Sequence, residues 1–392
     1  MKEDYLYAII AALFLCLFMA LYNNKECFIA SNSYKSLSSW TNNSSAIMNL
    51  PLSEFYINSS HNSYLAGYQI LGDPSYKNVE YALKAGARNI ELDIHSYNST
   101  LLKKASNTLF FIPNIVTSLG NAIQGKKPDD RYPVVTHGNG SINDIKSTEL
   151  SIVLSNIKDN AFKLTSDPLI IYLEIFDSND EYYMQILAGL LKKYLGDSLY
   201  EYTFDKIINN KDLFNAKYVF KVPIKDLQNK IILIINYYNM ENLNNRGKYL
   251  FPLIHGCTNE PGTGWQEDQS FSMVNGADER EPIRWTRNKE FFRVFPYNKL
   301  KSDNYNPEPY WASGYNMTSL NFSNEDVFME RNNNFFKFCG YIPKKAIVGP
   351  NGEITLPSGT FRGVNLYNNS ISGSSLIMPK TIYKTGIWCS LN

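Results

Sequence analysis

The sequence predicts an α/β protein whose parallel strands form one barrel, and three observations lead to this prediction. The 392 residues are enough for one large barrel or for two ordinary domains. Residues 55–95 have the pattern of a strand, a helix and a second strand, which is the spacing of a β-α-β unit. Four apolar runs each end in a polar residue that can do chemistry, as strands do at the carboxyl-end rim of a parallel barrel.

An apolar run of 18 residues, Tyr5 to Tyr22, precedes the predicted barrel and contains no charge, Pro or Gly. It is long enough to cross a bilayer as a helix. A cleaved signal peptide is the alternative, but the segment before the run carries one Lys and two acids, and no small-x-small cleavage site follows. We therefore expect a retained transmembrane anchor, followed by a flexible tether rich in Asn and Ser at 23–50.

The first β-α-β unit gathers polar side chains. An apolar run from Phe55 ends in Ser59-Ser60-His61-Asn62, a helix is expected over 77–85 with Gly86 as its stop, and 89–95 alternate as a strand does. Glu91, Asp93 and His95 share one face of that strand. Burying two carboxylates on one face is costly unless a positive group lies between them, and a divalent cation is the simplest such group. A polar strand face open to water is the alternative.

These residues also carry a resemblance to a known family. S-S-H-N-S-Y-L, followed about thirty residues later by R-N-I-E-L-D-I, resembles the X box of the eukaryotic-type phosphoinositide-specific phospholipases C. The resemblance implies a distorted TIM (β/α)8 barrel formed by X and Y halves. It also implies a site with two histidines and a calcium ion held by Asn, Glu, Asp and Glu.

The remaining apolar runs supply the missing members of that site. Residues 132–136 lead to His137, and 169–173 lead to Glu174. Together with His61-Asn62 and Glu91-x-Asp93 they complete the constellation. The segment 97–130 between these strands is longer than the family norm. We expect it to form either a helix packed on the barrel or an apolar ridge that dips into lipid.

The middle of the chain departs from the family at the headgroup. Residues 181–195 are amphipathic and predict a barrel helix that Gly196 ends. The segment 222–236 resembles the next strand, where the family places two lysines that hold ring phosphates. Here those positions are Ile234 and Asn236. Without two cations, much of the reason to prefer a bisphosphorylated headgroup is removed.

The second half resembles the family's Y box. Polar residues 239–268 correspond to the X–Y linker, after which Ser270, Arg293 and Phe295 match substrate-contacting positions, with Phe295 in place of a ring-stacking Tyr. Arg293 can alternatively serve as a structural ion-pair partner. The S-D-N-Y-N-P turn at 302–307, Trp311 and Leu320-Asn321-Phe322 are expected to close the barrel. The division is therefore an X half over 51–180, a helix, strand and linker over 181–268, a Y half over 269–345 and a tail of short strands over 346–392.

The resemblance also implies a mechanism. The inositol 2-hydroxyl attacks the phosphodiester, and calcium lowers the pKa of that hydroxyl. Asn62, Glu91, Asp93 and Glu174 would ligate calcium, an ion suited to oxygen ligands. Glu91 would also act as general base, His61 would donate to the phosphoryl oxygen, and His137 would protonate the diacylglycerol oxygen. His95 and His255 match nothing and are expected to be surface or packing residues.

Composition narrows the alternatives. The 38 basic and 37 acidic residues nearly cancel, and no basic stripe suggests nucleic acid as a partner. Five scattered cysteines indicate neither a disulfide framework nor a zinc site. The leading expectation is a membrane-anchored enzyme acting on a phosphoinositide lipid, with its catalytic domain on the cytosolic side. The alternatives are the same chemistry on unphosphorylated or glycosylated phosphatidylinositol, and a retired lipid-binding module. No protein partner is predicted, and Asn-x-Ser/Thr sequences such as those at Asn316 and Asn321 are expected by chance in an Asn-rich chain.

Overall fold

A computed structural model describes most of the predicted barrel. The described residues are 36–39, 44–67, 72–97, 131–137, 147–176, 180–201, 219–235, 249–250, 252–258, 270–275, 291–296, 302–312, 314–344, 347–348 and 354–355. The predicted anchor at 5–22 lies outside them, and so does the insertion predicted at 97–130 except for its first residue. Within the described ranges, no helix has the length and apolar character needed to span a bilayer.

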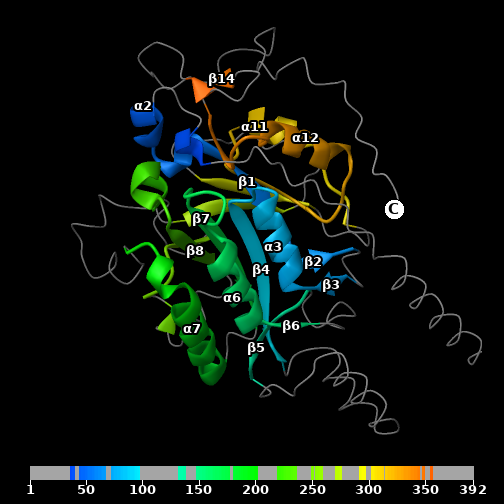
Figure 1. Ribbon diagram of the computed structural model, residues 1–392. Coiled ribbons are helices and arrows are strands. Elements are labelled where there is room, and N and C mark those ends of the chain that lie inside the picture. The colour runs from blue at the N-terminus through cyan, green and yellow to red at the C-terminus, as the bar shows by residue number, and fades with distance from the viewer. Residues whose placement is uncertain are drawn as a thin grey trace, which may run out of the picture.

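Eight parallel strands of the described chain close into a ring, which confirms the predicted barrel (Figure 1). Going round the ring they are β1 (Phe55–Ser60), β4 (Asn89–Ser96), β7 (Leu169–Ile175), β8 (Ile231–Ile235), β9 (Gly256–Thr258), β10 (Ser270–Asn275), β11 (Phe292–Phe295) and β12 (Met317–Leu320). Closure comes from β1, which pairs with both β12 and β4, the latter through Ser59 and Asn89. All carboxyl ends therefore lie at one rim.

Further short strands extend the ring or lie beside it. They are β13 (Tyr341–Pro343), antiparallel to β1; β5 (Pro133–Val135) and β6 (Thr148–Glu149), which continue from β4; and the pairs β2 (Leu65–Ala66) with β3 (Asp73–Pro74) and β14 (Ile347–Val348) with β15 (Ile354–Thr355). The last pair lies in the tail predicted to hold short strands.

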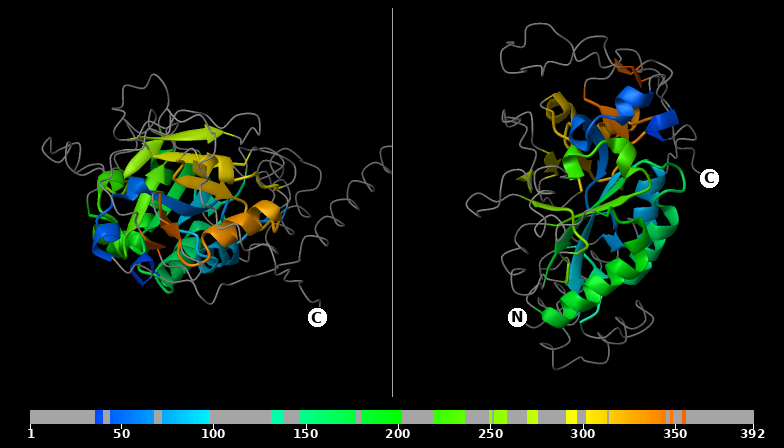
Figure 2. Two further views of the ribbon diagram at one scale, coloured as in Figure 1. Left: turned by 90° about the horizontal axis from the view of Figure 1, so that it is seen from above. Right: turned by 90° about the vertical axis from the view of Figure 1, so that its left-hand side faces the viewer.

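Three helices line one side of the barrel in succession, as the right panel of Figure 2 shows. They are α3 (Tyr76–Lys84), α6 (Leu150–Asn160) and α7 (Glu181–Leu195). Three further helices, α2 (Ser44–Met48), α11 (Glu308–Ala312) and α12 (Val327–Phe335), lie toward the other end of the molecule in Figure 1. Ser75 and Asp180 begin α3 and α7 by accepting backbone N–H groups through their side chains, as N-cap residues do.

Side-chain alternation along the strands produces two apolar layers. Odd-numbered residues of β7 and β8, such as Leu169 and Leu233, pack outward against the helices. Even-numbered residues such as Ile170, Tyr172 and Ile234 fill the barrel interior. Tyr56 and Tyr341 fasten the interior by donating hydrogen bonds to the carbonyls of Trp311 and Pro168.

Two predicted segment assignments are wrong for the residues that the structure describes. The predicted tether at 23–50 is docked in part: Leu37 and Ile47 are fully buried, and the Leu37 N–H donates to both oxygens of Asp167. The predicted linker at 239–268 contains β9, a barrel strand. Its three residues are too few for a period-2 pattern, so composition suggested a loop instead.

Candidate active site

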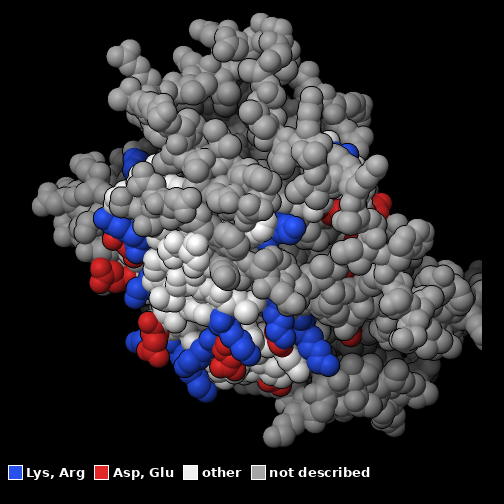
Figure 3. Space-filling view, turned by 45° about the horizontal axis from the view of Figure 1, so that its top comes forward, with Lys and Arg blue, Asp and Glu red and all other residues white. Residues whose placement is uncertain are grey.

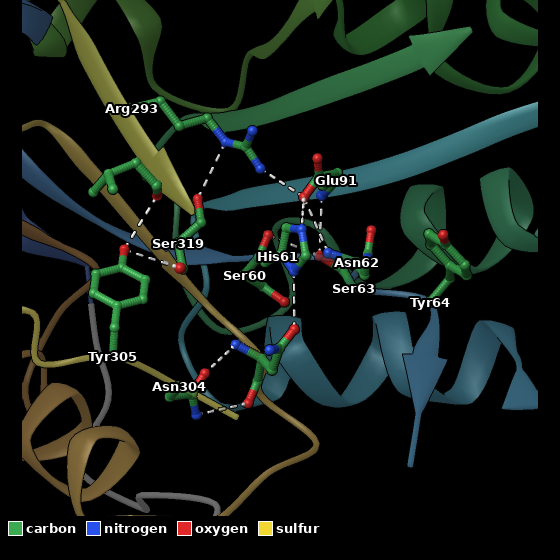
Figure 4. A network of polar contacts seen from close by, with 12 residues as sticks. Ser60, His61, Asn62, Ser63, Tyr64, Glu91, Arg293, Asn304, Tyr305 and Ser319 are labelled. Atoms are coloured by element: carbon green, nitrogen blue, oxygen red, sulfur yellow. Dashed lines mark hydrogen bonds and ion pairs between the residues drawn. The ribbon is translucent and has the colours of Figure 1, made fainter. Parts of the chain in front are cut away.

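The first side chains of the site come from the end of β1 and the turn that follows it. Asn62 has a positive φ of 42°, a conformation that Asn tolerates better than most residues. In this turn the Asn62 N–H donates to Glu91 Oε2 at 3.0 Å, and Glu91 N–H donates to Ser63 Oγ at 3.0 Å. The turn therefore holds the His-Asn pair against β4, as Figure 4 shows.

Three carboxylates meet at the carboxyl ends of β4 and β7. Asp93 lies opposite Glu174 in the strand register, and one oxygen atom from each of Glu91, Asp93 and Glu174 lies within 4.8 Å of the others. Glu91 is 2% exposed and Asp93 5%. Burial, with the nearby charges of Glu174 and Glu91, raises the pKa of Asp93 well above its ordinary value. Buried carboxylates this close repel one another and form a site that a cation would stabilise.

Asp93 offers an oxygen suited to a metal ion. Its Oδ1 is buried and has no hydrogen-bond partner among the described residues. A buried carboxylate oxygen without a donor is costly, and a divalent cation would satisfy it. The all-oxygen donor set of Glu91, Asp93 and Glu174 fits calcium or magnesium better than zinc.

Glu91 is the point where the charges of the site converge. Arg293 Nη2 donates to Glu91 Oε2 at 2.6 Å, and His61 Nε2 lies 3.8 Å from the same oxygen. Burial alone would raise the pKa of Glu91, but Arg293, His61 and the Asn62 N–H hold it below its ordinary value. Glu91 is thus ionised at neutral pH.

Arg293 is fully buried and committed to its neighbours. Besides Glu91, its Nε donates to Ser319 Oγ at 3.2 Å, and its guanidinium lies 4.5 Å from the ring centroid of Tyr172 and 4.9 Å from that of Phe295. The ion pair with Glu91 is the structural role that the sequence left open as an alternative to phosphate binding.

His61 lies between two neighbours. Its ring stacks on Phe295, with centroids 5.5 Å apart and planes 15° apart, and its Nδ1 is 2.9 Å from Asn321 Oδ1. Burial and the Arg293 charge lower the pKa of His61, and Glu91 and Asn321 only partly oppose this. Phe295, expected to contact substrate, thus faces a histidine of the site.

The strand that leads to His137 is not a barrel strand as the sequence suggested. β5 runs antiparallel to β4, pairing Val135 with Ile94, so His137 arrives from a hairpin-like extension of β4. Its neighbour Thr136 donates its N–H to the Asp93 carbonyl, and the Tyr64 hydroxyl donates to the Thr136 carbonyl. These bonds hold the backbone next to His137 beside the carboxylates.

Other predicted residues have simpler outcomes. Ile234 is fully buried opposite Tyr172 and supplies no cation, while Asn236 lies outside the described residues. Ser270 begins β10, of which only the backbone is described. His95 stacks on Phe176, and His255 is bonded on both ring nitrogens to the backbone, so both pack as expected.

The sequence missed the polar residues that support this site. Tyr64, Tyr172, Ser319 and Asn321 are buried around it and come from β7, from the turn after β1 and from the end of β12. Each lies near the carboxyl end of a predicted strand. The rule that located His61 and Glu174 would have located them too, had it been applied to every strand.

Comparison with known proteins gives consistent matches. Residues 48–236 match the family model described as phosphatidylinositol-specific phospholipase C, X domain, and 261–347 match the corresponding Y domain. The chain is 24% identical to 1-phosphatidylinositol 4,5-bisphosphate phosphodiesterase 1 of Candida albicans, covering 76% of this chain and 31% of that protein. It is 24% identical to phosphoinositide phospholipase C 1 of Arabidopsis thaliana, covering 82% and 59%.

Two further similarities are to a relative that is named inactive and to a solved structure. The human inactive phospholipase C-like protein 2 is 26% identical, covering 85% of this chain and 30% of that protein. The crystal structure of PLC21 from L. pealei superposes with a TM-score of 0.55 at 20% identity, covering 76% of this chain and 37% of that one, which supports the fold. The chain thus spans less than two thirds of the length of each of these relatives.

Proposed function

Because this chain belongs to the phosphatidylinositol-specific phospholipase C family, with X and Y domains, we propose that it is a calcium-dependent phosphoinositide phospholipase C. The reaction would convert phosphatidylinositol 4,5-bisphosphate, or unphosphorylated phosphatidylinositol, into diacylglycerol and an inositol phosphate. One observation carries the proposal: Glu91, Asp93 and Glu174 meet at the rim of the barrel beside His61.

Asn62, Glu91, Asp93 and Glu174 would hold the calcium ion. When bound, the ion would lower the pKa of the inositol 2-hydroxyl and offset the negative charge that builds on the phosphoryl group. Asp93 Oδ1 has no hydrogen-bond partner in the described part of the chain, and crowding raises the pKa of Asp93; both support a cation at this place. The hard oxygen ligands favour calcium over a transition metal.

The chain's own residues would move the protons. The 2-hydroxyl oxygen forms a bond to phosphorus while the bond from phosphorus to the glycerol oxygen breaks. Glu91 accepts the hydroxyl proton, His61 in its doubly protonated form donates through Nε2 to a phosphoryl oxygen, and His137 protonates the departing glycerol oxygen. The lowered pKa of Glu91 keeps it ionised but makes it a weak base. Proton transfer to Glu91 would therefore depend on the lower pKa that a bound ion gives the 2-hydroxyl.

Ile234 bears on which lipid headgroup the site prefers. A buried isoleucine replaces one of the two lysines expected to face ring phosphates. Arg293 is engaged by Glu91, and Ser270 and Phe295 carry no charge to replace the lost cations. These features favour unphosphorylated phosphatidylinositol, or a glycosylated relative, over the bisphosphate.

The decisive measurement is release of water-soluble inositol phosphate by the full chain from mixed phosphoinositide vesicles, with calcium and with chelator. We expect calcium-dependent release that His61→Ala and His137→Ala each reduce by at least about 10²-fold, a usual contribution of acid–base groups. Initial rates on phosphatidylinositol and its bisphosphate then identify the headgroup. A bisphosphate rate well above the other would contradict the argument from Ile234.

A second candidate function is a retired lipid-binding module. It is favoured by the 26% identity to a relative that is named inactive. Retention of all six proposed catalytic and metal positions in this chain argues against it. Absence of release from every lipid, with calcium still bound in calorimetry, would support the module over the enzyme.

The proposal places the protein at a membrane. The apolar run at 5–22 would be a single-pass anchor, and the catalytic domain would face the cytosol, where phosphoinositides are presented. Extraction of membranes at high pH tests the anchor, since an anchored chain stays with the lipid and a chain without residues 1–22 does not. Protease protection of sealed vesicles tests which side the domain occupies.

A further inference from the structure

Asn321 is the partner of His61 on the side of the ring that faces away from Glu91. It follows directly after β12, 260 positions along the chain from His61, and its Oδ1 lies 2.9 Å from Nδ1 of the ring. Both side chains are buried, at 4% and 8% exposure. Figure 4 shows the His61 ring beside Glu91.

The orientation of the Asn321 amide follows from its other bond. Asn321 Nδ2 lies 3.3 Å from the backbone carbonyl of Asp303, which can only accept a hydrogen bond. The nitrogen must therefore face Asp303, and the oxygen must face His61. An amide oxygen can only accept, so His61 Nδ1 has to carry the hydrogen.

A second asparagine holds Asn321 in place. The backbone N–H of Asn321 donates to Asn304 Oδ1 at 2.6 Å, and Asn304 Nδ2 donates back to the Asn321 carbonyl at 3.2 Å. The Asn304 N–H in turn donates to Asp326, the residue that caps α12. His61 is thus oriented by a continuous polar path that begins at a helix terminus.

We propose that Asn321 is a positioning residue that fixes His61 in the tautomer with hydrogen on Nδ1 and leaves Nε2 facing the catalytic carboxylates. The assignment of the tautomer rests only on these contacts. Its kinetic consequence rests on the proposed function, in which Nε2 donates to the phosphoryl oxygen once it has gained a proton, while Nδ1 keeps its bond to Asn321. Stacking on Phe295 fixes the plane of the ring, and Asn321 fixes its rotation within that plane.

An amide suits this role better than a carboxylate. An imidazole carries hydrogen on Nδ1 both in this tautomer and when it is charged, so Asn321 accepts the same hydrogen bond in both states. The ring need not turn when Nε2 gains or loses a proton. A neutral partner also adds no negative charge beside Glu91.

The test is nitrogen NMR on the full chain labelled only at histidine. The chain contains four histidines, so substituting each in turn assigns every ring. In the wild type at neutral pH we expect His61 to show the nitrogen shifts of an Nδ1–H ring. Asn321→Leu, close in shape but without an acceptor, should shift the ring toward hydrogen on Nε2, whereas Asn321→Asp, which keeps an oxygen acceptor, should preserve the wild-type tautomer.

A matched control separates positioning from general damage. Asn332 is fully buried and donates to Asn58 Oδ1 at 2.9 Å, away from the His61 ring. Asn332→Leu removes a comparable buried amide and should leave the His61 shifts unchanged. In vesicle hydrolysis Asn321→Leu should lower kcat about 10- to 100-fold with KM within about 2-fold, the size of effect known for residues that orient a functional group.

The possible outcomes test the tautomer assignment, the positioning role and the proposed function separately. Hydrogen on Nε2 in the wild type, or an unchanged tautomer in Asn321→Leu, would overturn the assignment. A changed tautomer with unchanged kcat would overturn the positioning role. If the wild type hydrolyses no lipid, the proposed function fails, while the NMR comparison still decides whether Asn321 sets the tautomer.

Discussion

At the scale of single residues, the site is organised around one buried charge. Glu91 accepts hydrogen bonds from the Asn62 N–H and from Arg293, and it faces His61. A buried carboxylate loses its hydration, so it persists as an ion only where donors and positive charge replace water. The role of Arg293 as counter-ion of Glu91 therefore comes before any role in substrate binding.

This role predicts the effect of removing Arg293. Arg293→Met should lower the free energy of unfolding in chelator by about 3–5 kcal/mol, because it leaves the Glu91 charge buried and unpaired. Denaturant unfolding measures the change. In the double variant Glu91→Gln/Arg293→Met neither charge of this ion pair remains, and most of the lost stability should return. A double variant as unstable as Arg293→Met would show that packing of the arginine, and not its charge, is what matters.

Substitution of Asp93, the carboxylate next to Glu91, should not destabilise the protein as substitution of Arg293 does. Burial and two nearby carboxylates raise the pKa of Asp93, so its ionised form destabilises the metal-free protein. Asp93→Asn should be at least as stable as the wild type in chelator. In calcium at about 100 times its Kd, the wild type should gain about 2.7 kcal/mol and the variant far less. Thermal unfolding with calcium and with magnesium measures both, and an equal gain in the variant would remove Asp93 from the metal site.

At the scale of elements, His255 joins three segments around β8. Leu233 N–H donates to His255 Nδ1 at 3.0 Å, and the ring donates from Nε2 to the Tyr200 carbonyl at 2.8 Å. A proton on Nδ1 would confront the Leu233 N–H, and burial already disfavours the charged ring. Burial accordingly lowers the pKa of His255 to about 4.

The lowered pKa of His255 determines in which direction the free energy of unfolding changes with pH. The folded state binds the proton less tightly than the unfolded chain, so the stabilisation is complete above the ordinary pKa of 6.5 and is lost as pH falls toward 4. At about 1.4 kcal/mol per unit, the loss is about 3 kcal/mol. His255→Gln should flatten this part of the curve of unfolding free energy against pH, and an unchanged slope in the variant would assign the loss to other groups.

The N-terminal segment provides a second prediction at this scale. Leu37 is fully buried, and its N–H donates to Asp167, a buried carboxyl whose pKa is raised by burial to about 6. A chain that starts at residue 45 loses this contact, and about 3–5 kcal/mol of stability with it, from one buried leucine and a buried carboxyl that loses the Leu37 donor. Chemical denaturation of chains starting at residues 30 and 45 measures the difference, and equal stabilities would show that the segment is dispensable.

At the scale of the whole molecule, the sequence pattern predicted the positions of the site residues better than it predicted how the strands are connected. His61, Glu91, Asp93 and Glu174 were placed from strand ends, because parallel strands bring their carboxyl ends to one rim. β9 and the antiparallel direction of β5 were missed, because three-residue strands carry no period and direction is set by partners distant in sequence. The pairing of Arg293 with Glu91, 202 positions apart, was likewise invisible before the ring closed. On the described part of the face in Figure 3, charges of both signs lie interspersed, as the near-neutral composition suggests.

The way the ring closes predicts how the molecule can be divided. β1, β4, β7, β8 and β9 precede residue 259, and β10, β11 and β12 follow residue 269. The two parts meet along β1–β12, where Ile57 pairs with Met317, and along β9–β10. Neither part can close a barrel alone, since each leaves an open edge and half of the apolar interior exposed. We therefore expect co-expressed fragments 1–262 and 263–392 to assemble, and each fragment alone to aggregate.

Assembly is measured by co-purification through a tag on one fragment, followed by circular dichroism of the complex. Met317→Asp places a charge in the buried β1–β12 seam and should prevent assembly of the fragments. The intact chain should tolerate the same change better, because covalent linkage holds its two parts at an effective concentration of about millimolar. A first fragment that unfolds cooperatively as a soluble monomer would contradict the expectation, since it would mean that five strands form a stable unit without the other three.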